Sequence, residues 1–251
     1  MSIEIIRPDI FPDDEVRAFF TLKNDQLYSN ERSIDGLNVG FNTDENPEII
    51  TKNRHHVLDE FNINPNHVAF ANQVHSSGVK EVIEGGTFAD TDALITRTPG
   101  LALAIQVADC AAVLIADVHS KTIAAVHAGW RGATGNIILR TMDNMCRLGA
   151  DPKDCKAFIS PCISLKNFEI GYEVAEQFPD QFVDYEHYRK PHLDLKAFLK
   201  QQLTETGLHK KYILVHPDCT VNKEKKYYSY RREKDKSGRM MGIIQLKAEA
   251  I

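Results

Sequence analysis

The sequence predicts an α+β protein with α/β-type layers, in which a mixed β-sheet is covered by helices. Short apolar runs of strand length alternate along the chain with amphipathic stretches of helix length. The 251 residues are 43% hydrophobic and 26% charged, a composition that suffices for a large buried core. No long flexible linker interrupts them, so we expect residues 1–251 to form a single compact domain.

The first hundred residues predict short strands and one amphipathic helix. A strand is expected at 16–21 and a polar loop at 23–32. The helix covers 47–61, because its apolar residues fall on one side and Glu48 favours its positively charged N-terminal end. Further strands are expected at 68–74, 79–83 and 94–96.

Two consecutive apolar strands in the middle of the chain predict a hairpin. They cover 112–118 and 122–127, and a three-residue turn between them would place position 113 opposite 127. Cys110 then lies roughly 10 Å of extended chain beyond this pair. The segment 109–112 must therefore bend back if Cys110 and His127 share a ligand, and a kink there is part of the prediction.

The rest of the chain continues the alternation of helices and strands. The clearest helix covers 134–148, has its apolar residues on one face and is stopped by Gly149. A β-hairpin is expected near the end of the chain, formed by 226–232 and 239–246. The other expected elements are strands at 101–107, 156–159 and 212–215 and helices at 173–178 and 193–206.

Charge and cysteine content narrow the functional class. The net charge of -5 comes from 35 acidic and 30 basic residues spread along the chain, which argues against nucleic acid or an anionic membrane as a partner. No apolar run has the length of a signal peptide or a membrane span, so a cytoplasmic protein is expected. Five scattered cysteines argue against a disulfide framework, and no dinucleotide or phosphate-loop motif occurs. These features favour small-molecule chemistry.

Three strand ends carry residues that suit a ligand site better than a core. The segment 124–132, Ala-Ala-Val-His-Ala-Gly-Trp-Arg-Gly, leaves an apolar strand through His127 and two glycines, which allow close approach of a ligand to the backbone. Asn-Gln-Val-His-Ser supplies His75, and Ala-Asp-Cys supplies Cys110. Two imidazoles and one thiolate suit zinc with one coordination position left open.

The spacing of these residues leaves other interpretations open, because it matches no short metal motif. Cys110 could pair with His127 or His75 as the nucleophile and base of a cysteine hydrolase. Asp109 could orient a histidine through its second ring nitrogen, or serve as a turn cap. The predicted helix begins beside Arg131, where unpaired backbone amides favour an anion such as phosphate.

Several motifs resemble those of a known family. They are Asn-Gln-Val-His-Ser at 72–76, Ala-Asp-Cys at 108–110, His-Ala-Gly-Trp-Arg-Gly at 127–132, Tyr-Ser-Tyr-Arg-Arg at 228–232 and Gly-Arg-Met at 238–240. The chain resembles the bacterial laccase-domain proteins, also called the multicopper polyphenol oxidase or peptidoglycan-editing-factor family and now regarded as zinc-dependent purine nucleoside phosphorylases. Leu-Asn-Val-Gly at 37–40 and Asn-Arg at 53–54 extend the likeness over about 37–246.

The resemblance implies that His75, Cys110 and His127 are the metal ligands, for zinc or, as the alternative, copper. It also implies phosphorolysis of adenosine, inosine, guanosine and methylthioadenosine, together with adenosine deamination, on the family's cysteine-hydrolase-like fold. Purine nucleosides and phosphate are then the expected partners of a monomer or homodimer. The expected catalytic residues are Cys110, His75, His127 and Asp109, and the expected substrate contacts are Gln73, Arg131 and Arg231.

Three other functions stay open, of which a plain binding module is weakened because a site with an open metal position has little use in one. Copper-dependent oxidation of phenols is disfavoured, because one Cys-His-His set without any His-x-His pair offers too few ligands for several coppers. An editing hydrolase for peptidoglycan precursors would use Cys110 as a metal-free nucleophile. The chain departs from the family's pattern at 20–23 and at Ser160, where the family has glycine before Pro161. These departures concern substrate choice, since none falls on the three ligands.

Overall fold

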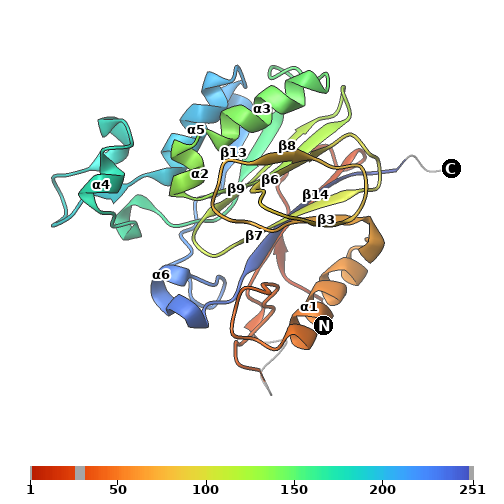
Figure 1. Cartoon of the computed structure of the whole chain (residues 1–251), viewed down its shortest axis with the longest axis horizontal. Helices are drawn as coiled ribbons and strands as arrows, with labels where there is room; N and C mark the ends of the chain where they lie inside the picture. The colour runs from red at the N-terminus through yellow and green to blue at the C-terminus, as the bar shows by residue number, and fades with distance from the viewer. Residues whose placement is uncertain (1, 26–31, 249–251) are drawn as a thin grey trace.

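Two six-stranded mixed sheets pack face to face at the centre of the molecule (Figure 1). The computed structural model describes residues 2–25 and 32–248. The strand order of the first sheet is β1 (Ile5–Ile6), β2 (Val16–Thr21), β14 (Met240–Leu246), β7 (Ala102–Val107), β3 (Val68–Ala71) and β5 (Gly86–Phe88). The order of the second is β13 (Ile213–Val215), β10 (Lys156–Ile159), β8 (Ala111–Asp117), β9 (Thr122–Ala128), β6 (Ala93–Thr96) and β4 (Val79–Glu81).

Helices cover the outer faces of this pair of sheets. Helix α1 (Pro47–Glu60) packs on the first sheet, and α3 (Ile137–Arg147) and α5 (Leu195–Glu205) pack on the second (Figure 1). The short elements are α2 (Trp130–Thr134), α4 (Tyr172–Ala175), α6 (Tyr230–Glu233), the 3-10 helices η2 (Pro65–His67), η3 (Leu165–Asn167), η4 (Asp180–Phe182), η5 (Lys210–Tyr212) and η6 (Lys234–Lys236), and the strand pair β11 (Val183–Asp184) and β12 (His192–Leu193). The predicted mixed α+β architecture is therefore confirmed, but with two stacked sheets in place of one.

Alternation of side chains explains how one strand serves two cores. Strands β8 and β9 are buried along their whole length. In β8, Val113 and Ile115 face the helices, whereas Ala112 and Leu114 face the first sheet. The sheets approach closely at Gly242 of β14, where an added Cβ would lie 2.8 Å from that of Ala112. Both strands are apolar on both sides because neither of their faces reaches water.

The register of the central hairpin differs by one residue from the predicted one. His127 lies opposite Ala112, not opposite position 113. The reason is the connection, which contains four residues and not three, and which the Asp117 carboxylate closes by accepting a hydrogen bond from the backbone of His119 at 2.9 Å. Because side chains alternate along a strand, this register places His127 on the face that looks toward the first sheet.

Two further elements differ from the prediction. The helix expected at 134–148 is α3, which begins only at Ile137 because Asn136 takes a left-handed backbone conformation with φ 61°, and the separate short helix α2 precedes it. The expected hairpin of 226–232 with 239–246 is wrong, because β14 pairs with β2 and β7, and the earlier segment contains α6. Ser229 caps that helix by accepting from the backbone N–H of Arg232.

The other expected strands and helices are present within a few residues of their predicted bounds. Of the polar loop predicted at 23–32, residues 26–31 lie outside the described part of the chain. In the described ranges, no helix has the length and apolar character that crossing a membrane requires.

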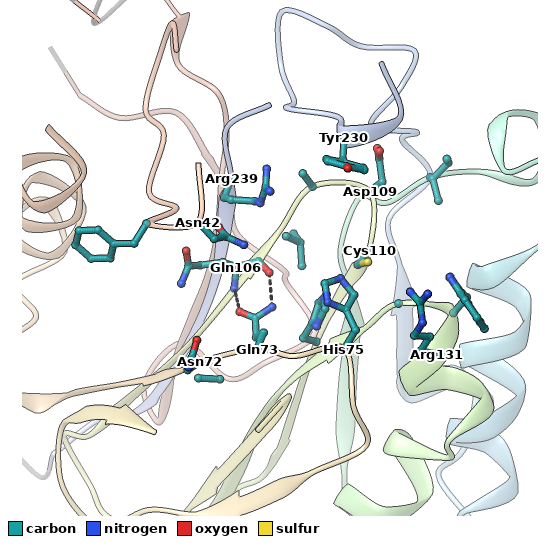
Figure 2. Close-up of a pocket in the computed structure, with 18 of the residues that line it drawn as sticks. Asn42, Asn72, Gln73, His75, Gln106, Asp109, Cys110, Arg131, Tyr230 and Arg239 are labelled. Atoms are coloured by element: carbon teal, nitrogen blue, oxygen red, sulfur yellow. Dashed lines mark hydrogen bonds between the residues drawn. The ribbon is translucent and has the colours of Figure 1, made fainter. Parts of the chain in front are cut away.

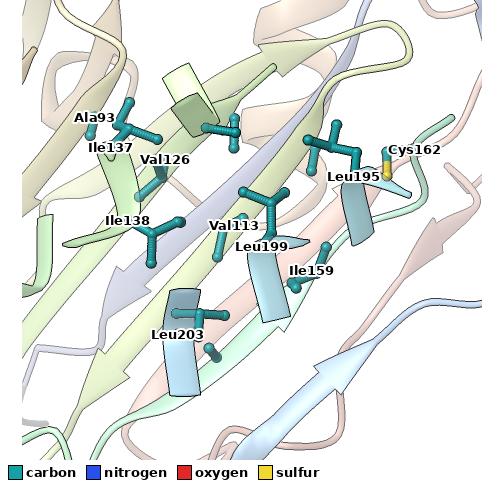
Figure 3. Close-up of a cluster of buried hydrophobic side chains, with 14 of the residues drawn as sticks. Ala93, Val113, Val126, Ile137, Ile138, Ile159, Cys162, Leu195, Leu199 and Leu203 are labelled. Atoms are coloured by element: carbon teal, nitrogen blue, oxygen red, sulfur yellow. The ribbon is translucent and has the colours of Figure 1, made fainter. Parts of the chain in front are cut away.

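An apolar cluster fastens the helices to the second sheet (Figure 3). Leu199 and Leu203 of α5 and Ile138 of α3 are completely buried against it. The figure shows these side chains over Val113 and Val126 of the sheet. The cluster thus supports the strand that carries His127.

Shortening Leu199 to alanine should lower the free energy of unfolding by about 2–5 kcal/mol, because it leaves a cavity in a fully packed core. Lys200→Ala, at the neighbouring exposed position of the same helix, is the matched control. Urea denaturation followed by circular dichroism measures both. Equal midpoints for the two variants would contradict the packing described here.

Candidate metal centre

Three chain segments meet at one end of the two sheets (Figure 2). His75 follows β3 after three intervening residues, Cys110 precedes β8 directly, and His127 lies near the end of β9. One ligand atom from each residue lies within 4.8 Å of those of the other two. The fold therefore brings together the three residues that the sequence predicts as metal ligands.

The kink predicted before β8 is present at Asp109, whose φ of 79° is left-handed. The buried carboxylate of this residue accepts hydrogen bonds from the Thr220 hydroxyl at 2.5 Å, the Ser229 hydroxyl at 3.0 Å and the backbone N–H of Arg231 at 2.6 Å. These bonds fix the C-terminal segment over the site. Among the described residues no histidine bonds to Asp109, and its carboxylate caps no local turn either, because all three of its partners belong to the remote C-terminal segment.

The carboxylate that orients one of the candidate ligand histidines is Asp92, which the sequence analysis did not single out. Its Oδ1 lies 2.7 Å from Nδ1 of His127 and accepts the backbone N–H of His75 at 3.0 Å. Its Oδ2 accepts both the N–H and the hydroxyl of Ser76, at 2.7 and 2.8 Å. One fully buried group thus holds two of the three candidate ligands. The only sequence signal was an acid directly before a short apolar run, and such acids often cap turns.

Asp92 also stabilises an uncommon backbone. His75 has φ 59°, a conformation that favours glycine, and the N–H groups of Val74, His75 and Ser76 all point at the same carboxylate. Because Asp92 occupies Nδ1 of His127, the Nε2 atom is left to face the ligand cluster.

The charges around Cys110 favour the thiolate form of its side chain, the form that can bind a cation. Burial would raise the pKa of the Cys110 thiol, but the charges and hydrogen bonds of His127 and His75 lower it to about 6. For His127, burial acts to lower the pKa, yet Cys110 and Asp92 together raise it. Cys110 is therefore deprotonated at neutral pH, which is the form that binds metal.

Gly129 provides the space for the cysteine ligand. A Cβ atom at this position would lie 2.7 Å from the Cys110 sulfur and 3.7 Å from Cδ2 of His75. The donor set, the mutual distances, the orienting carboxylate and this clearance all fit a metal ion held by three protein ligands.

The ligands form part of the wall of a pocket of about 740 Å³, a size typical of small-molecule sites. Gln73 lines it, and its amide group exchanges two hydrogen bonds with the backbone of Gln106, at 2.6 and 2.8 Å (Figure 2). Both polar atoms of the Gln73 amide thus fasten the His75 segment to the end of β7. A direct contact from Gln73 to substrate stays a prediction.

The two arginines predicted as substrate contacts also line the pocket. Arg131 is exposed in the first turn of α2, with its guanidinium 4.3 Å from the ring centre of Trp130. Arg231 donates from Nη2 to the carbonyl of Glu169 at 2.8 Å. The pocket has further lining residues that the sequence analysis did not assign, namely Phe41, Asn42, Arg54, Phe70, Asn72, Gln106, Tyr230 and Arg239. The only sequence feature that could have identified these residues is their position in or next to the motifs that resemble the family.

Replacing Asp92 with asparagine should weaken metal binding by about 10- to 100-fold, because the ligand histidines lose a charged orienting partner. Competition with a chromogenic zinc chelator measures the affinity. Asp109→Asn is the matched control, since that carboxylate bonds to the C-terminal segment and not to a ligand histidine. A loss of affinity in the control alone would show that Asp109 is the orienting group.

The metal-free protein should be alkylated at Cys110 by iodoacetamide with a rate that rises through about pH 6 and then levels off, because only the thiolate reacts. Exposed Cys146 should still gain reactivity above pH 8, since burial and nearby acids raise its pKa. Peptide mass spectrometry follows both sites. Added zinc should protect Cys110, and parallel pH profiles for the two cysteines would contradict a stabilised thiolate.

Solved structures share this fold. A hypothetical protein YfiH of Bacillus licheniformis superposes with a TM-score of 0.87 at 28% identity, covering 92% of this chain and 93% of that one. YlmD of Geobacillus stearothermophilus superposes with a TM-score of 0.88 at 23% identity, over 96% and 94% of the two chains, and supports the fold alone.

Sequence relatives extend the comparison. A purine nucleoside phosphorylase of Deinococcus radiodurans is 36% identical over 214 residues, which are 84% of this chain and 82% of that protein. One of Corynebacterium glutamicum is 34% identical over 221 residues, or 85% and 88% of the two proteins. The family described as multi-copper polyphenol oxidoreductase laccase matches residues 17–247. The chain therefore belongs to the multi-copper polyphenol oxidoreductase laccase family.

Proposed function

We propose that this protein is a zinc-dependent purine nucleoside phosphorylase that also deaminates adenosine. The observation that carries the proposal is the convergence of His75, Cys110 and His127 on the wall of a pocket of nucleoside-accommodating size. The relatives named as purine nucleoside phosphorylases supply the substrate class, since their sequences match over more than four-fifths of this chain. Adenosine, inosine, guanosine and methylthioadenosine are the proposed nucleosides.

Zinc fits the two imidazoles and one thiolate better than a hard cation does, and copper is the alternative metal. When bound, zinc supplies Lewis-acid chemistry, polarising an oxygen atom and lowering the pKa of a water. Asp92 keeps His127 in one tautomer and orientation for that purpose. Asp109 acts by positioning the segment that carries Tyr230 and Arg231.

The rest of the pocket suits a purine nucleoside. The side chains of Asn42, Asn72 and Gln106 offer both donors and acceptors, as the edge of a purine requires. Phe70 and Tyr230 offer aromatic surface for stacking. Gln73, Arg131 and Arg231 are the proposed additional substrate contacts. Deamination occurs at carbon 6 of the base and phosphorolysis at the sugar carbon that bears the base, so the nucleoside must lie along the pocket.

Other features of the proposal come from the sequence. We propose a cytoplasmic enzyme, a monomer or homodimer made of a single domain over residues 1–251, with neither nucleic acid nor membrane as a partner. The cysteine-hydrolase-like description of the fold is likewise a proposal. The charge balance, without a strongly basic surface, supports a small-molecule substrate.

A second candidate is a cysteine hydrolase that edits peptidoglycan precursors. It is favoured by one observation, namely that histidines lower the pKa of Cys110 to about 6, as they do for catalytic thiols. The protection of Cys110 by zinc separates the two functions, because a nucleophile must stay accessible in the active enzyme.

Phenol oxidation by several coppers has less support, although the family carries that description. Within the described ranges, the three-residue cluster of His75, Cys110 and His127 is the one group suited to a metal. Reduction of oxygen by a laccase needs several coppers, for which the described part of the chain offers no second set of ligands.

With zinc and phosphate present, the protein should convert inosine to hypoxanthine, and it should deaminate adenosine without phosphate. His127→Ala should reduce both rates more than about a hundredfold, because one metal serves both reactions and even an indirect partner of a ligand contributes 10- to 100-fold. Chromatography of the bases and nucleosides measures both activities.

His119→Ala is the matched control, because this exposed histidine lies at the other end of the same hairpin. Elemental analysis should find about one zinc per chain in the wild type and in the control, and much less in His127→Ala. Retention of one activity by His127→Ala would disprove the shared metal. Absence of phosphate-dependent hypoxanthine from the zinc-loaded wild type would disprove phosphorolysis.

A further inference from the structure

Two arginines in the pocket have no acidic partner. Arg54 comes from helix α1 and Arg239 directly precedes β14, and both line the pocket that holds the metal ligands. Among residues 2–25 and 32–248, no carboxylate forms an ion pair with either guanidinium. Arg54 is buried and Arg239 is half-buried, and a guanidinium taken out of water without a bonded anion is costly, so the two indicate a site for an anion that arrives with the ligand.

Arg54 is held rigidly and is only 8% exposed. Its guanidinium carbon lies over two aromatic rings, 4.3 Å from the ring centre of Phe41 and 4.6 Å from that of Phe70. Its Nε donates to the carbonyl of Val39 at 2.8 Å, whereas the two Nη atoms bond to no described residue. Burial lowers the pKa of Arg54 to about 10, which still leaves the group charged at neutral pH. The contacts with two aromatic rings hold the planar group in place, and its Nη atoms are free to bind a ligand.

Arg239 reaches the same pocket because Gly40 leaves room for it. A Cβ atom on Gly40 would lie 2.3 Å from Cγ of Arg239. Its Nη1 donates to the carbonyls of Ser237 and Gly238, at 2.7 and 3.0 Å, and Nη2 and Nε have no partner among the described residues. Burial also lowers the pKa of Arg239. The absence of a side chain at Gly40, the glycine of the Leu-Asn-Val-Gly motif, thus allows Arg239 to reach the pocket.

Asn38 joins the segments that carry the two arginines. Its side-chain oxygen accepts the backbone N–H groups of Gly40 and Arg239, at 3.0 and 2.9 Å. Its carbonyl accepts from the side chain of Asn53, the neighbour of Arg54, at 2.6 Å. Both guanidiniums are therefore fixed before a ligand arrives, which lowers the entropic cost of binding.

We propose that Arg54 and Arg239 form the phosphate-binding subsite of this pocket. The inference rests on the proposed function, in which phosphate is a co-substrate. Guanidinium groups match the oxygens of a phosphate with paired, charge-assisted hydrogen bonds. Figure 2 shows Arg239 on one side of His75 and Cys110 and Arg131 on the other. The subsite thus differs from the start of α2, whose five residues include the exposed Arg131.

The position of the subsite suits the reaction. In a nucleoside whose carbon 6 faces the metal ligands, the sugar lies on the far side of the base. Asn42 and Gln106 lie near Arg239 in Figure 2, in the region that such a base would occupy. The phosphate group in the subsite is either inorganic phosphate or the 5′-phosphoryl group of a purine nucleotide, because the same donors recognise both.

Titration calorimetry with inorganic phosphate and the zinc-loaded protein tests the subsite without reference to activity. Arg54→Gln and Arg239→Gln should each raise the Kd for phosphate about 10- to 100-fold, as expected for the loss of charge-assisted hydrogen bonds. Arg140→Gln removes an exposed arginine from α3, outside the pocket, and should bind phosphate as the wild type does. If Arg54→Gln fails to fold, Arg239→Gln and Arg239→Lys carry the test, because the lysine should restore part of the affinity.

A second titration, with inosine and inosine 5′-monophosphate, identifies the source of the phosphate. If the variants lose affinity for inorganic phosphate, the subsite binds the co-substrate. If the variants keep their affinity for inorganic phosphate but no longer bind inosine 5′-monophosphate more tightly than inosine, the subsite binds the phosphoryl group of a nucleotide. Unchanged affinities in both titrations, or a loss confined to Arg131→Gln, would overturn the proposal. A wild type that binds phosphate through these arginines but does not cleave inosine would leave the subsite valid and disprove the phosphorylase.

Discussion

The candidate site depends on one buried carboxylate. Asp92 lies at the start of β6, whose neighbour in the sheet is β9, and it receives N–H groups from the loop that follows β3 in the other sheet. It therefore joins His127 of one sheet to His75 beside the other. A buried carboxylate without these donors would be strongly destabilising, so the fold and the ligand geometry stabilise each other. Burial acts to raise the pKa of Asp92, but the hydrogen bond and charge of His127, followed by the hydrogen bonds from Ser76, outweigh it and lower that pKa.

The pocket exists because two sheets pack over most of their length and separate at one end. At that end the chain continues beyond β7 and β9 with the small or polar residues Ala108, Asp109 and Gly129, which line the pocket. Asp109 then draws the C-terminal segment across this end through three hydrogen bonds. The segment brings Tyr230 and Arg231 to the pocket, and Arg239 enters where Gly40 lacks a side chain. Residues far apart in the sequence thus form one wall.

The geometry of the site suits more than one kind of chemistry. A thiolate next to two imidazoles is suited both to a metal and to nucleophilic attack. What distinguishes the two here is the arrangement around them. Gly129 clears space beside the sulfur, Asp92 fixes His127, and His75 places a third candidate ligand atom within 4.8 Å of the other two. A cysteine nucleophile needs a single base, whereas three converging donors are what a metal requires.

The sequence by itself determined the mixed α+β class, most strand and helix positions, the three candidate ligands and the bend at Asp109, because apolar periodicity and strand-end residues are local properties. The tertiary structure decided what depends on distant partners. Two sheets in place of one, the one-residue register of β8 and β9 and the loss of the expected C-terminal hairpin all follow from pairing between remote segments. Asp92 took the role considered for Asp109 for the same reason. The order of the strands in the sheet decides which acidic side chain contacts His127. No local sequence pattern predicts that contact.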